Sequence, residues 1–309
     1  MILSLPNNNK IIIFNKESIK DFFFTKISDM PTNKIMNNIK EDIFIGCDGG
    51  GVAQCKIKIQ ELLDSKVIRF LGQNNILCIN QRMEIKKSLI SFQANNSLIL
   101  IGDTFINNTR LFTYNNSTIF IGDNNFFNPV GVSKRIIAAE GKNIFIGNDN
   151  LFSVNIWIRC SDAHVLYDFL GKRINFPDSV YIGDHIWLCE NIGILKGTRI
   201  HSGVTVATNS TIGNKILYSN NIYGGSPVKL VKKDICWAKG TAVNYWTATE
   251  IFKYSSADVS KIIFIPDENF IPFNKIEEDI QDIPNLEDKL IYLLQIYMYR
   301  NNNRFAASN

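Results

Sequence analysis

The 309-residue chain lacks several features that would assign it to common classes of protein. It has no run of 18 or more apolar residues, and its first fifteen residues lack the basic start, apolar core and small-residue cleavage site of an export signal. Its six cysteines form no CxxC pair, which argues against a zinc knuckle and a disulfide framework. These absences predict a cytoplasmic protein with reduced thiols and no membrane insertion.

The charge balance gives no sign of a nucleic-acid partner. Lysine and arginine exceed aspartate and glutamate by only four, and the basic residues are scattered along the chain. With 45% hydrophobic residues, the chain can still bury a sizeable core. Asparagine, about one residue in eight, tolerates left-handed backbone at tight corners. Its excess fits either a fold with many repeated turns or an AT-rich genome.

One phrase recurs along the middle of the chain. Near-copies end at Asp103 (SLILIGD), Asp123 (STIFIGD), Asn148 (NIFIGN) and Asp184 (SVYIGD). From residue 182 an aliphatic residue recurs at every sixth position. Four positions after each of these residues stands another aliphatic residue or a small one. The first set is Ile182, Leu188, Ile194, Ile200, Val206 and Ile212, and the second is Ile186, Ile192, Thr198, Val204, Ser210 and Ile216.

A period of six fits a short strand and a tight turn repeated three times in each coil of a triangular prism. A single coil cannot bury its own inner face, so the coils must stack. The repeat therefore predicts an all-β core, a parallel β-helix filled by a ladder of Ile, Leu and Val. We expect this β-helix over residues 81–240.

The two ends of the chain lack the repeat. Residues 1–80 hold apolar segments at 11–14, 43–45 and 67–71 and an expected helix over 52–64, which suggest an α+β cap. Residues 241–309 form the expected C-terminal helical extension, in which Asn285 would cap a helix. The apolar face of that helix is Leu286, Leu290, Leu293 and Tyr297, with Glu287 and Asp288 in its first turn and Arg300 in its last. This helix is expected to pack on the prism or on another subunit.

Only three histidines are present, His164, His185 and His201, so candidates for a general base are few. His164 lies in a polar excursion that interrupts the hexads. The register runs through Ile146, Phe152 and Ile158 and is expected to resume at Phe176 and Ile182. Because loops on rigid scaffolds commonly carry function, His164 is the leading candidate.

The repeat, the passage SDAHVLYDFLGKRIN and the following IGDHIW resemble the hexapeptide-repeat acyltransferases. The resemblance is closest to bacterial polysaccharide O-acetyltransferases, including those acting on sialic acid capsules. It implies a left-handed prism and a homotrimer with sites between subunits. It also implies direct acetyl transfer from acetyl-CoA to a hydroxyl of a glycan acceptor in capsule or lipo-oligosaccharide. The family's catalytic histidine corresponds to His164, and the tryptophan beside its thioester corresponds to Trp187.

These residue types suit the implied reaction. A sugar hydroxyl is a poor nucleophile, so an imidazole must accept its proton as it attacks the thioester. The oxyanion then needs a donor, either a backbone N–H or the Trp187 indole N–H. Asp162 or a main-chain carbonyl would orient His164. Acceptor contacts are expected at Tyr167, Arg173 and His185.

The segments VTVATNSTIG and NNIYGGSPVKLVKK resemble the family's terminal coils, where the pantetheine arm and the nucleotide phosphates of the CoA bind. The resemblance implicates small residues along the arm and lysines at the phosphates. The matching residues are Ala207, Thr208, Gly225, Ser226, Pro227, Lys229, Lys232 and Lys233. Ser226 stands where the family usually has Asn, and Cys189 and Glu190 follow Trp187 where it has small residues.

The histidines and a glycine cluster also allow other kinds of site. Spacings of 21 and 16 residues between the histidines, without HxxxxH, argue against a metal site. The glycine cluster Gly46–Gly51 predicts a tight connection rather than a phosphate site, since it matches no nucleotide motif. One rival function is acetylation of a small acceptor, such as a nucleotide-linked sugar or an antibiotic, in a deep closed pocket. The other is a non-catalytic glycan-binding or assembly scaffold with an occluded CoA channel.

Overall fold

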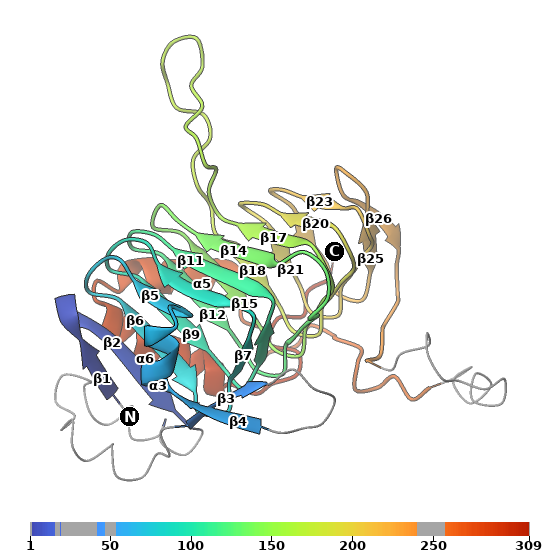
Figure 1. Cartoon of the computed structure of the whole chain (residues 1–309). Coiled ribbons are helices and arrows are strands. Elements are labelled where there is room, and N and C mark those ends of the chain that lie inside the picture. Colours follow the sequence, from blue (N-terminus) through green and yellow to red (C-terminus); the bar gives the residue numbers. More distant parts are fainter. Residues whose placement is uncertain (1, 16–18, 20–41, 47–53, 240–256, 309) are drawn as a thin grey trace.

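The computed structural model describes residues 2–15, 19, 42–46, 54–239 and 257–308. Through its middle the chain winds in coils whose short strands stack into three sheets, the sides of a prism (Figure 1). Successive coils pair in parallel, for example residues 98–101 with 118–121 and those with 143–146. The predicted all-β core and parallel β-helix are confirmed.

The sheets are named A, B and C. Sheet A contains, in spatial order, β1 (Ile2–Leu5), β2 (Asn9–Phe14), β6 (Ile76–Asn80), β9 (Leu98–Ile101), β12 (Thr118–Ile121), β15 (Asn143–Ile146), β18 (Val180–Ile182), β21 (Arg199–Ile200) and β24 (Ile216–Leu217). Sheet B contains β26 (Lys229–Lys232), β25 (Ile222–Gly224), β22 (Thr205–Val206), β19 (Trp187–Leu188), β16 (Leu151–Phe152), β13 (Phe126–Phe127), β10 (Phe105–Asn107), β7 (Glu84–Lys86), β3 (Asp42–Gly46) and β4 (Gln54–Lys58). Sheet C contains β23 (Thr211–Ile212), β20 (Ile192–Ile194), β17 (Ile156–Arg159), β14 (Lys134–Ala138), β11 (Thr109–Thr113), β8 (Leu89–Phe92) and β5 (Ile68–Phe70).

The hexad residues fill the inside of the prism. Every member of the predicted six-residue ladder, from Ile182 to Ile212, is fully buried, and each such side chain stabilises the fold by about 1.5–3 kcal/mol. Two expected positions are wrong. Ile216 is 51% exposed because this coil is one residue shorter than the repeat predicts, so Leu217 pairs with the inner Ile200 and Ile216 pairs with Arg199 on the outside. Phe176 is 60% exposed under the guanidinium of Arg173, so the register resumes only at Ile182.

Asparagine occupies many of the corners between strands. Among the described residues, most non-glycine residues with positive φ are asparagines, for example Asn155, Asn191 and Asn209. Their side chains form a ladder, in which Asn155 Nδ2 donates to Asn191 Oδ1 at 2.8 Å and Asn191 Nδ2 donates to Asn209 Oδ1 at 3.0 Å. Asparagine adopts the left-handed conformation at low cost. The corners therefore account for part of the asparagine excess.

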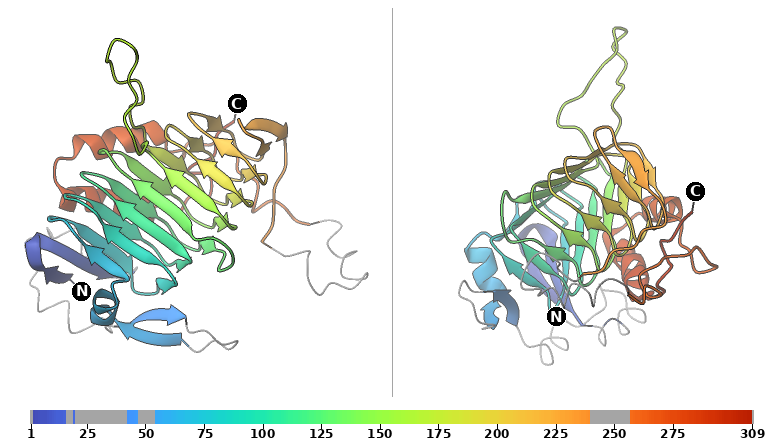
Figure 2. Two further views of the ribbon diagram at one scale, coloured as in Figure 1. Left: turned by 45° about the horizontal axis from the view of Figure 1, so that its top comes forward. Right: turned by 90° about the vertical axis from the view of Figure 1, so that its right-hand side faces the viewer.

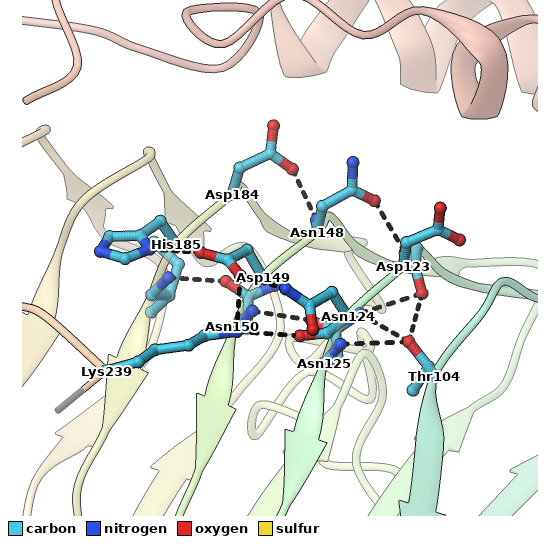
Figure 3. Close-up of polar contacts among 12 residues, drawn as sticks. Thr104, Asp123, Asn124, Asn125, Asn148, Asp149, Asn150, Asp184, His185 and Lys239 are labelled. Atoms are coloured by element: carbon cyan, nitrogen blue, oxygen red, sulfur yellow. Dashed lines mark hydrogen bonds and ion pairs between the residues drawn. The ribbon is translucent and has the colours of Figure 1, made fainter. Parts of the chain in front are cut away.

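The recurring I-G-[DN] phrase forms a second ladder at another corner (Figure 3). The N–H of Asp123 donates to Asn148 Oδ1 at 2.8 Å, and the N–H of Asn148 donates to Asp184 Oδ1 at 2.5 Å. A Cβ on Gly122 or Gly147 would lie 2.1 or 2.3 Å from these oxygens. Only glycine leaves room for the side chain of the next coil, which explains why the phrase repeats.

The N-terminal region adds strands to the prism. β2 pairs in parallel with β6, and β1 folds back antiparallel on β2. Parallel pairing of β5 with β8 and of β6 with β9 already occupies residues 68–80, inside the range expected for the cap. The helix expected over 52–64 is wrong in its first half, where residues 54–58 form β4 and only Ile59–Asp64 forms α3. The sequence QCKIK alternates between apolar and polar, which is the period of a strand.

Some sequence-based predictions lie outside the described residues. The glycine cluster is described only at Gly46, the last residue of β3. The boundary expected between residues 240 and 241 is also outside the described ranges. The division into three parts at residues 81 and 241 therefore stays a prediction.

Two C-terminal helices lie along one side of the prism (Figure 2). These are α5 (Phe273–Asp282) and α6 (Leu286–Met298). As predicted, Asn285 caps α6, accepting a hydrogen bond from the Asp288 N–H at 2.8 Å. Leu290, Leu293 and Tyr297 are buried in a cluster with the outer face of sheet A. Arg300 is not in the last turn, because α6 ends at Met298.

A buried carboxylate joins α5 to sheet A. Glu277 Oε1 accepts a hydrogen bond from Lys142 Nζ at 2.9 Å, and Glu277 Oε2 accepts one from the Tyr181 hydroxyl at 2.6 Å. Burial by itself would raise the pKa of Glu277, but hydrogen bonds from Ser179, Tyr181 and Lys142 outweigh it and lower the pKa to about 2. The folded state therefore holds this group ionised.

This carboxylate makes stability depend on acid pH. Because its folded pKa lies below the ordinary value of 4.5, its contribution is present above pH 4.5 and is lost as the pH falls toward 2. The shift corresponds to about 3 kcal/mol. We expect Glu277→Gln to flatten the decline in the free energy of unfolding between pH 4.5 and 2, measured by urea titration. An unchanged pH profile in the variant would contradict this role.

Candidate active site

The excursion that carries His164 rises from the corner after β17 as a long arm (Figure 1). Its two sides run antiparallel, with an isolated bridge between Tyr167 and Arg173. The Asp168 N–H donates to the Lys172 carbonyl at 2.9 Å, and the Ile174 N–H donates to the Leu166 carbonyl at 3.0 Å. The sequence thus makes a narrow hairpin-like arm with its tip at residues 168–172.

Asn175 braces the backbone around His164. Its Nδ2 donates to the His164 carbonyl at 2.8 Å, and its Oδ1 accepts from the Leu166 N–H at 2.8 Å. Asn175 is 6% exposed, whereas the His164 side chain is exposed. The two hydrogen bonds fix the main chain that directly follows His164, while His164 itself stays exposed to solvent. Sequence reasoning did not single out Asn175.

Asp162 ties the base of the arm to the next coil. Its Oδ2 accepts hydrogen bonds from Lys196 Nζ at 2.6 Å and from Asn175 Nδ2 at 2.9 Å. The hydrogen bond from Lys196 is the main reason that the pKa of Asp162 lies below its ordinary value. These contacts make Asp162 a brace of the arm, linked to the His164 carbonyl through Asn175.

The two predicted acceptor residues on the arm differ in their surroundings. Tyr167 is 62% exposed near the tip. Arg173 pairs with Glu140 at 2.7 Å, and its guanidinium lies 5.3 Å from the ring centroid of Phe176. Arg173 therefore helps to hold the arm, while Tyr167 is open to a ligand.

Trp187 lies on the outer face of sheet B and is 38% exposed. Its ring centroid is 6.0 Å from that of Trp237, which follows the last strand of the prism and is buried. His164 follows sheet C, so within one chain the two predicted catalytic residues lie at separate sides of the prism. Trp237 was not foreseen, because it lies 50 residues beyond Trp187 in a segment without repeats.

His185 requires a correction, since it is 4% exposed and both ring nitrogens are engaged. Nδ1 lies 2.5 Å from Asp149 Oδ2, and Nε2 lies 2.9 Å from the Trp237 carbonyl oxygen (Figure 3 shows the His185 and Asp149 side chains). The ring also stacks on Trp237 at 4.2 Å. His185 therefore cannot contact an acceptor in this structure. It positions Trp237 beside Trp187.

His201 is also enclosed. Its Nδ1 lies 3.1 Å from the Phe305 carbonyl oxygen, and burial lowers its pKa to about 4. Neutral and covered, this ring packs against Phe273 and takes no part in a site. Among the described residues, no three His, Cys, Asp or Glu side chains are grouped to hold a metal ion. Nor is any helix of the described chain long and apolar enough to cross a membrane.

The predicted CoA residues gather on the last coil. Ala207 and Thr208 follow β22, and β25 pairs with β22 in parallel before turning back antiparallel into β26. Ser210 Oγ accepts from the Gly225 N–H at 3.0 Å and donates to the Ala207 carbonyl at 2.6 Å, which joins the two segments. Thr208, Gly225, Ser226, Pro227, Lys229, Lys232 and Lys233 are all exposed. The turn and its lysines thus form one accessible end of the prism.

A hexapeptide prism with an exposed histidine arm and a basic last coil defines an acyltransferase of the hexapeptide-repeat class. No family model matches the chain. Over 185 residues it is 31% identical to the polysialic acid O-acetyltransferase of Neisseria meningitidis, covering 59% of this chain and 84% of that protein. It is 30% identical over 151 residues to the putative lipopolysaccharide biosynthesis O-acetyl transferase WbbJ of Escherichia coli K12, covering 45% of this chain and 74% of the relative.

The solved structure of the polySia-specific acetyltransferase NeuO superposes with a TM-score of 0.53 at 26% identity, covering 58% of this chain and 81% of that one. The chain therefore belongs to the hexapeptide-repeat O-acetyltransferases, related to those that modify capsular sialic acid. Its prism is the left-handed β-helix of that family, and the protein is an acetyltransferase.

Proposed function

We propose that this enzyme transfers an acetyl group from acetyl-CoA to a hydroxyl of a bacterial surface polysaccharide. The observation that carries the proposal is the similarity to the Neisseria meningitidis polysialic acid O-acetyltransferase over 84% of that protein. Capsule, lipo-oligosaccharide and sialic acid units are the candidate acceptors. The exposed arm suits a long substrate better than a closed pocket would.

In the proposed reaction His164 accepts the proton of the acceptor hydroxyl as its oxygen attacks the thioester carbonyl. The tetrahedral oxyanion is stabilised by a backbone N–H or by the Trp187 indole N–H. When the C–S bond breaks, the CoA sulfur leaves as a thiolate and takes the proton from His164. Transfer is direct, without an acyl-enzyme.

The site is proposed to form between copies of a homotrimer. His164 and Trp187 lie on separate sides of one prism, so a single chain does not bring them together. The arm also exposes apolar side chains at Leu166, Phe169 and Leu170, of which Phe169 and Leu170 are the most exposed. Burying such side chains against the Trp187 side of another copy would complete the site.

Acetyl-CoA would bind along the last coil of the prism. The exposed turn at Gly225 leaves room for the pantetheine arm beside Ala207, and Lys229, Lys232 and Lys233 would meet the phosphates as point charges. Trp237, held by His185, would form the wall of the thioester pocket opposite Trp187.

The test is thiol release from acetyl-CoA by the full-length protein with a panel of acceptors: sialylated oligomers, neutral capsular glycans, free sugars and nucleotide-linked sugars. We expect release that depends on a polysaccharide acceptor. Faster turnover of a free or nucleotide-linked sugar would show that the acceptor is a small molecule and not a polymer. No release with any acceptor, together with no binding of CoA in calorimetry, would overturn the enzyme assignment in favour of a scaffold.

A further inference from the structure

The segment that follows the last strand of the prism runs back along the corner between sheets A and B. We call residues 234–239 the strap. The Trp237 indole N–H donates to the His185 carbonyl at 2.9 Å, on the coil that contains β19. Two residues later, Lys239 Nζ donates to the Asn124 carbonyl at 3.2 Å, on the earlier coil that contains β13. The strap is therefore fastened to the prism at points that include the base of the tryptophan pair.

The His185 ring lies between two hydrogen-bond acceptors, the Asp149 carboxylate at 2.5 Å from Nδ1 and the Trp237 carbonyl at 2.9 Å from Nε2 (Figure 3). Burial alone would raise the pKa of Asp149, but hydrogen bonds from His185 and Lys239 lower it, so the carboxylate is ionised and has no proton to donate. A neutral imidazole has one N–H and can donate only once. Both contacts are hydrogen bonds only when the His185 ring carries two protons.

The surroundings of this ring decide how firmly the second proton is held. The ring stacks on Trp237 with centroids 4.2 Å apart and lies 5.6 Å from the ring of Phe264. Besides Asp149, the charged side chains around it are Lys239 on the strap and, lining a cavity of about 180 Å³, Asp184, Lys261, Arg300 and Arg304. Most of these groups are cations, which oppose a positive charge on the imidazole. The two hydrogen bonds therefore hold the second proton against this repulsion, and a rise in pH removes it.

We propose that Asp149 and His185 are positioning residues that hold the strap in place while the imidazole is charged and release it as the pH rises. Once one ring proton is lost, one ring nitrogen and its partner are two acceptors that face each other, so that contact becomes repulsive. The charged ring is the form that gains from its partners, so its contribution is present at low pH and is lost at high pH. Trp237 then loses its fixed place 6.0 Å from Trp187.

The inference rests on the proposed function, in which Trp237 forms a wall of the thioester pocket, and adds regulation to it: CoA binds more weakly as the pH rises. Asp149→Asn provides a sharp test. The amide nitrogen of asparagine donates to Nδ1, and its oxygen still accepts from Lys239, so a ring with one proton satisfies both partners. We expect this variant to keep the strap in place at every pH. His185→Gln, whose side chain does not titrate, is expected to be equally insensitive to pH.

The first measurement is the tryptophan fluorescence of the full-length protein without CoA, from about pH 5 to 9, the range in which histidines change charge. Trp237 is buried, so we expect the wild-type emission to move to longer wavelength as the pH rises and Trp237 meets water. No such movement is expected in Asp149→Asn. The control is Asp103→Asn, which neutralises another paired carboxylate at the same corner. The two carboxylates are similarly exposed, 33% for Asp149 and 30% for Asp103, and the control is expected to follow the wild type.

The second measurement is the Kd for CoA by calorimetry at the two ends of this pH range. Titration of lysines and of the CoA phosphates is common to both proteins, so the comparison uses the ratio of Kd at high pH to Kd at low pH. We expect this ratio to be about tenfold larger in the wild type than in Asp149→Asn, as the loss of one charge-assisted hydrogen bond implies.

Four results would overturn the proposal: wild-type emission that does not move with pH, the same movement in Asp149→Asn, no movement in Asp103→Asn, or equal Kd ratios in the wild type and Asp149→Asn. If Asp149→Asn does not fold, His185→Gln takes its place in both measurements. Absence of CoA binding at any pH would instead overturn the proposed function. The fluorescence is recorded without CoA, so it still decides whether Asp149 and His185 hold the strap.

Discussion

Replacement of His164 by alanine is expected to lower the rate of acetyl transfer by about 10²–10⁴-fold, the usual contribution of a positioned general base. His164 is exposed and the main chain that follows it is held by Asn175, so the substitution removes the ring without disturbing a packed core. The measurement is the initial rate of thiol release at saturating acetyl-CoA. Affinity for CoA should not change.

The matched control for this variant is Lys172→Ala at the tip of the same arm. Lys172 is exposed, and its hydrogen bonds to Asp168 use backbone atoms that alanine retains. A rate near that of the wild type in Lys172→Ala, together with the loss in His164→Ala, assigns the effect to the imidazole. Equal rates for His164→Ala and the wild type would remove His164 from the mechanism.

The second large effect is on stability, at the ion pair between Arg304 and Asp184 that attaches the C-terminal segment to the prism. Arg304 is 1% exposed, and its Nε and Nη2 groups donate to the two carboxylate oxygens of Asp184 at 2.7 and 2.9 Å. Its Nη1 group donates to the carbonyls of Ile296 and Tyr299 at the end of α6. Arg304→Met leaves a buried carboxylate without its partner, so we expect a loss of about 3–5 kcal/mol in the free energy of unfolding.

The comparison is Arg300→Met, which breaks a pair of similar length, 2.7 Å to Asp123, at a more exposed position. Its side chain is 36% exposed, and such pairs contribute about 0–1 kcal/mol. Urea unfolding followed by circular dichroism measures both variants. Similar losses of unfolding free energy in the two variants would show that burial does not determine how much the Arg304 pair contributes to stability.

The fold was predictable where the sequence repeats and less so elsewhere. Six strict hexads specify inner positions directly, because each coil meets the same environment. The end of the repeat is not specified so closely: the coil that ends at Leu217 is one residue shorter than the repeat predicts, which turns Ile216 outward. α5 was not expected, since Pro272 precedes it with no capping side chain and its apolar face depends on Tyr181 and Phe305 far away in the chain.

The site was predictable only in its individual residues. The phrase around His164 marks the arm, and the terminal phrases mark the turn at Gly225. The partners that hold these residues come from distant segments: Trp237 meets His185 across 52 residues, and Lys196 meets Asp162 across 34. No local sequence pattern encodes such pairs. The sequence therefore suggested that His185 contacts the acceptor, whereas in the structure its ring holds Trp237.

The C-terminal segment changes how the stack of coils responds to stress. In a solenoid each repeat touches only its neighbours, so the ends fray one repeat at a time. Here Glu287 binds Lys10 on β2, Tyr297 binds Asn80 at the end of β6, and Arg304 binds Asp184 after β18. If one of these coils unfolds, the C-terminal segment loses a contact there. The same segment contacts the other coils, so they are destabilised too. We therefore expect this linear array to unfold in one all-or-none step, as a globular domain does.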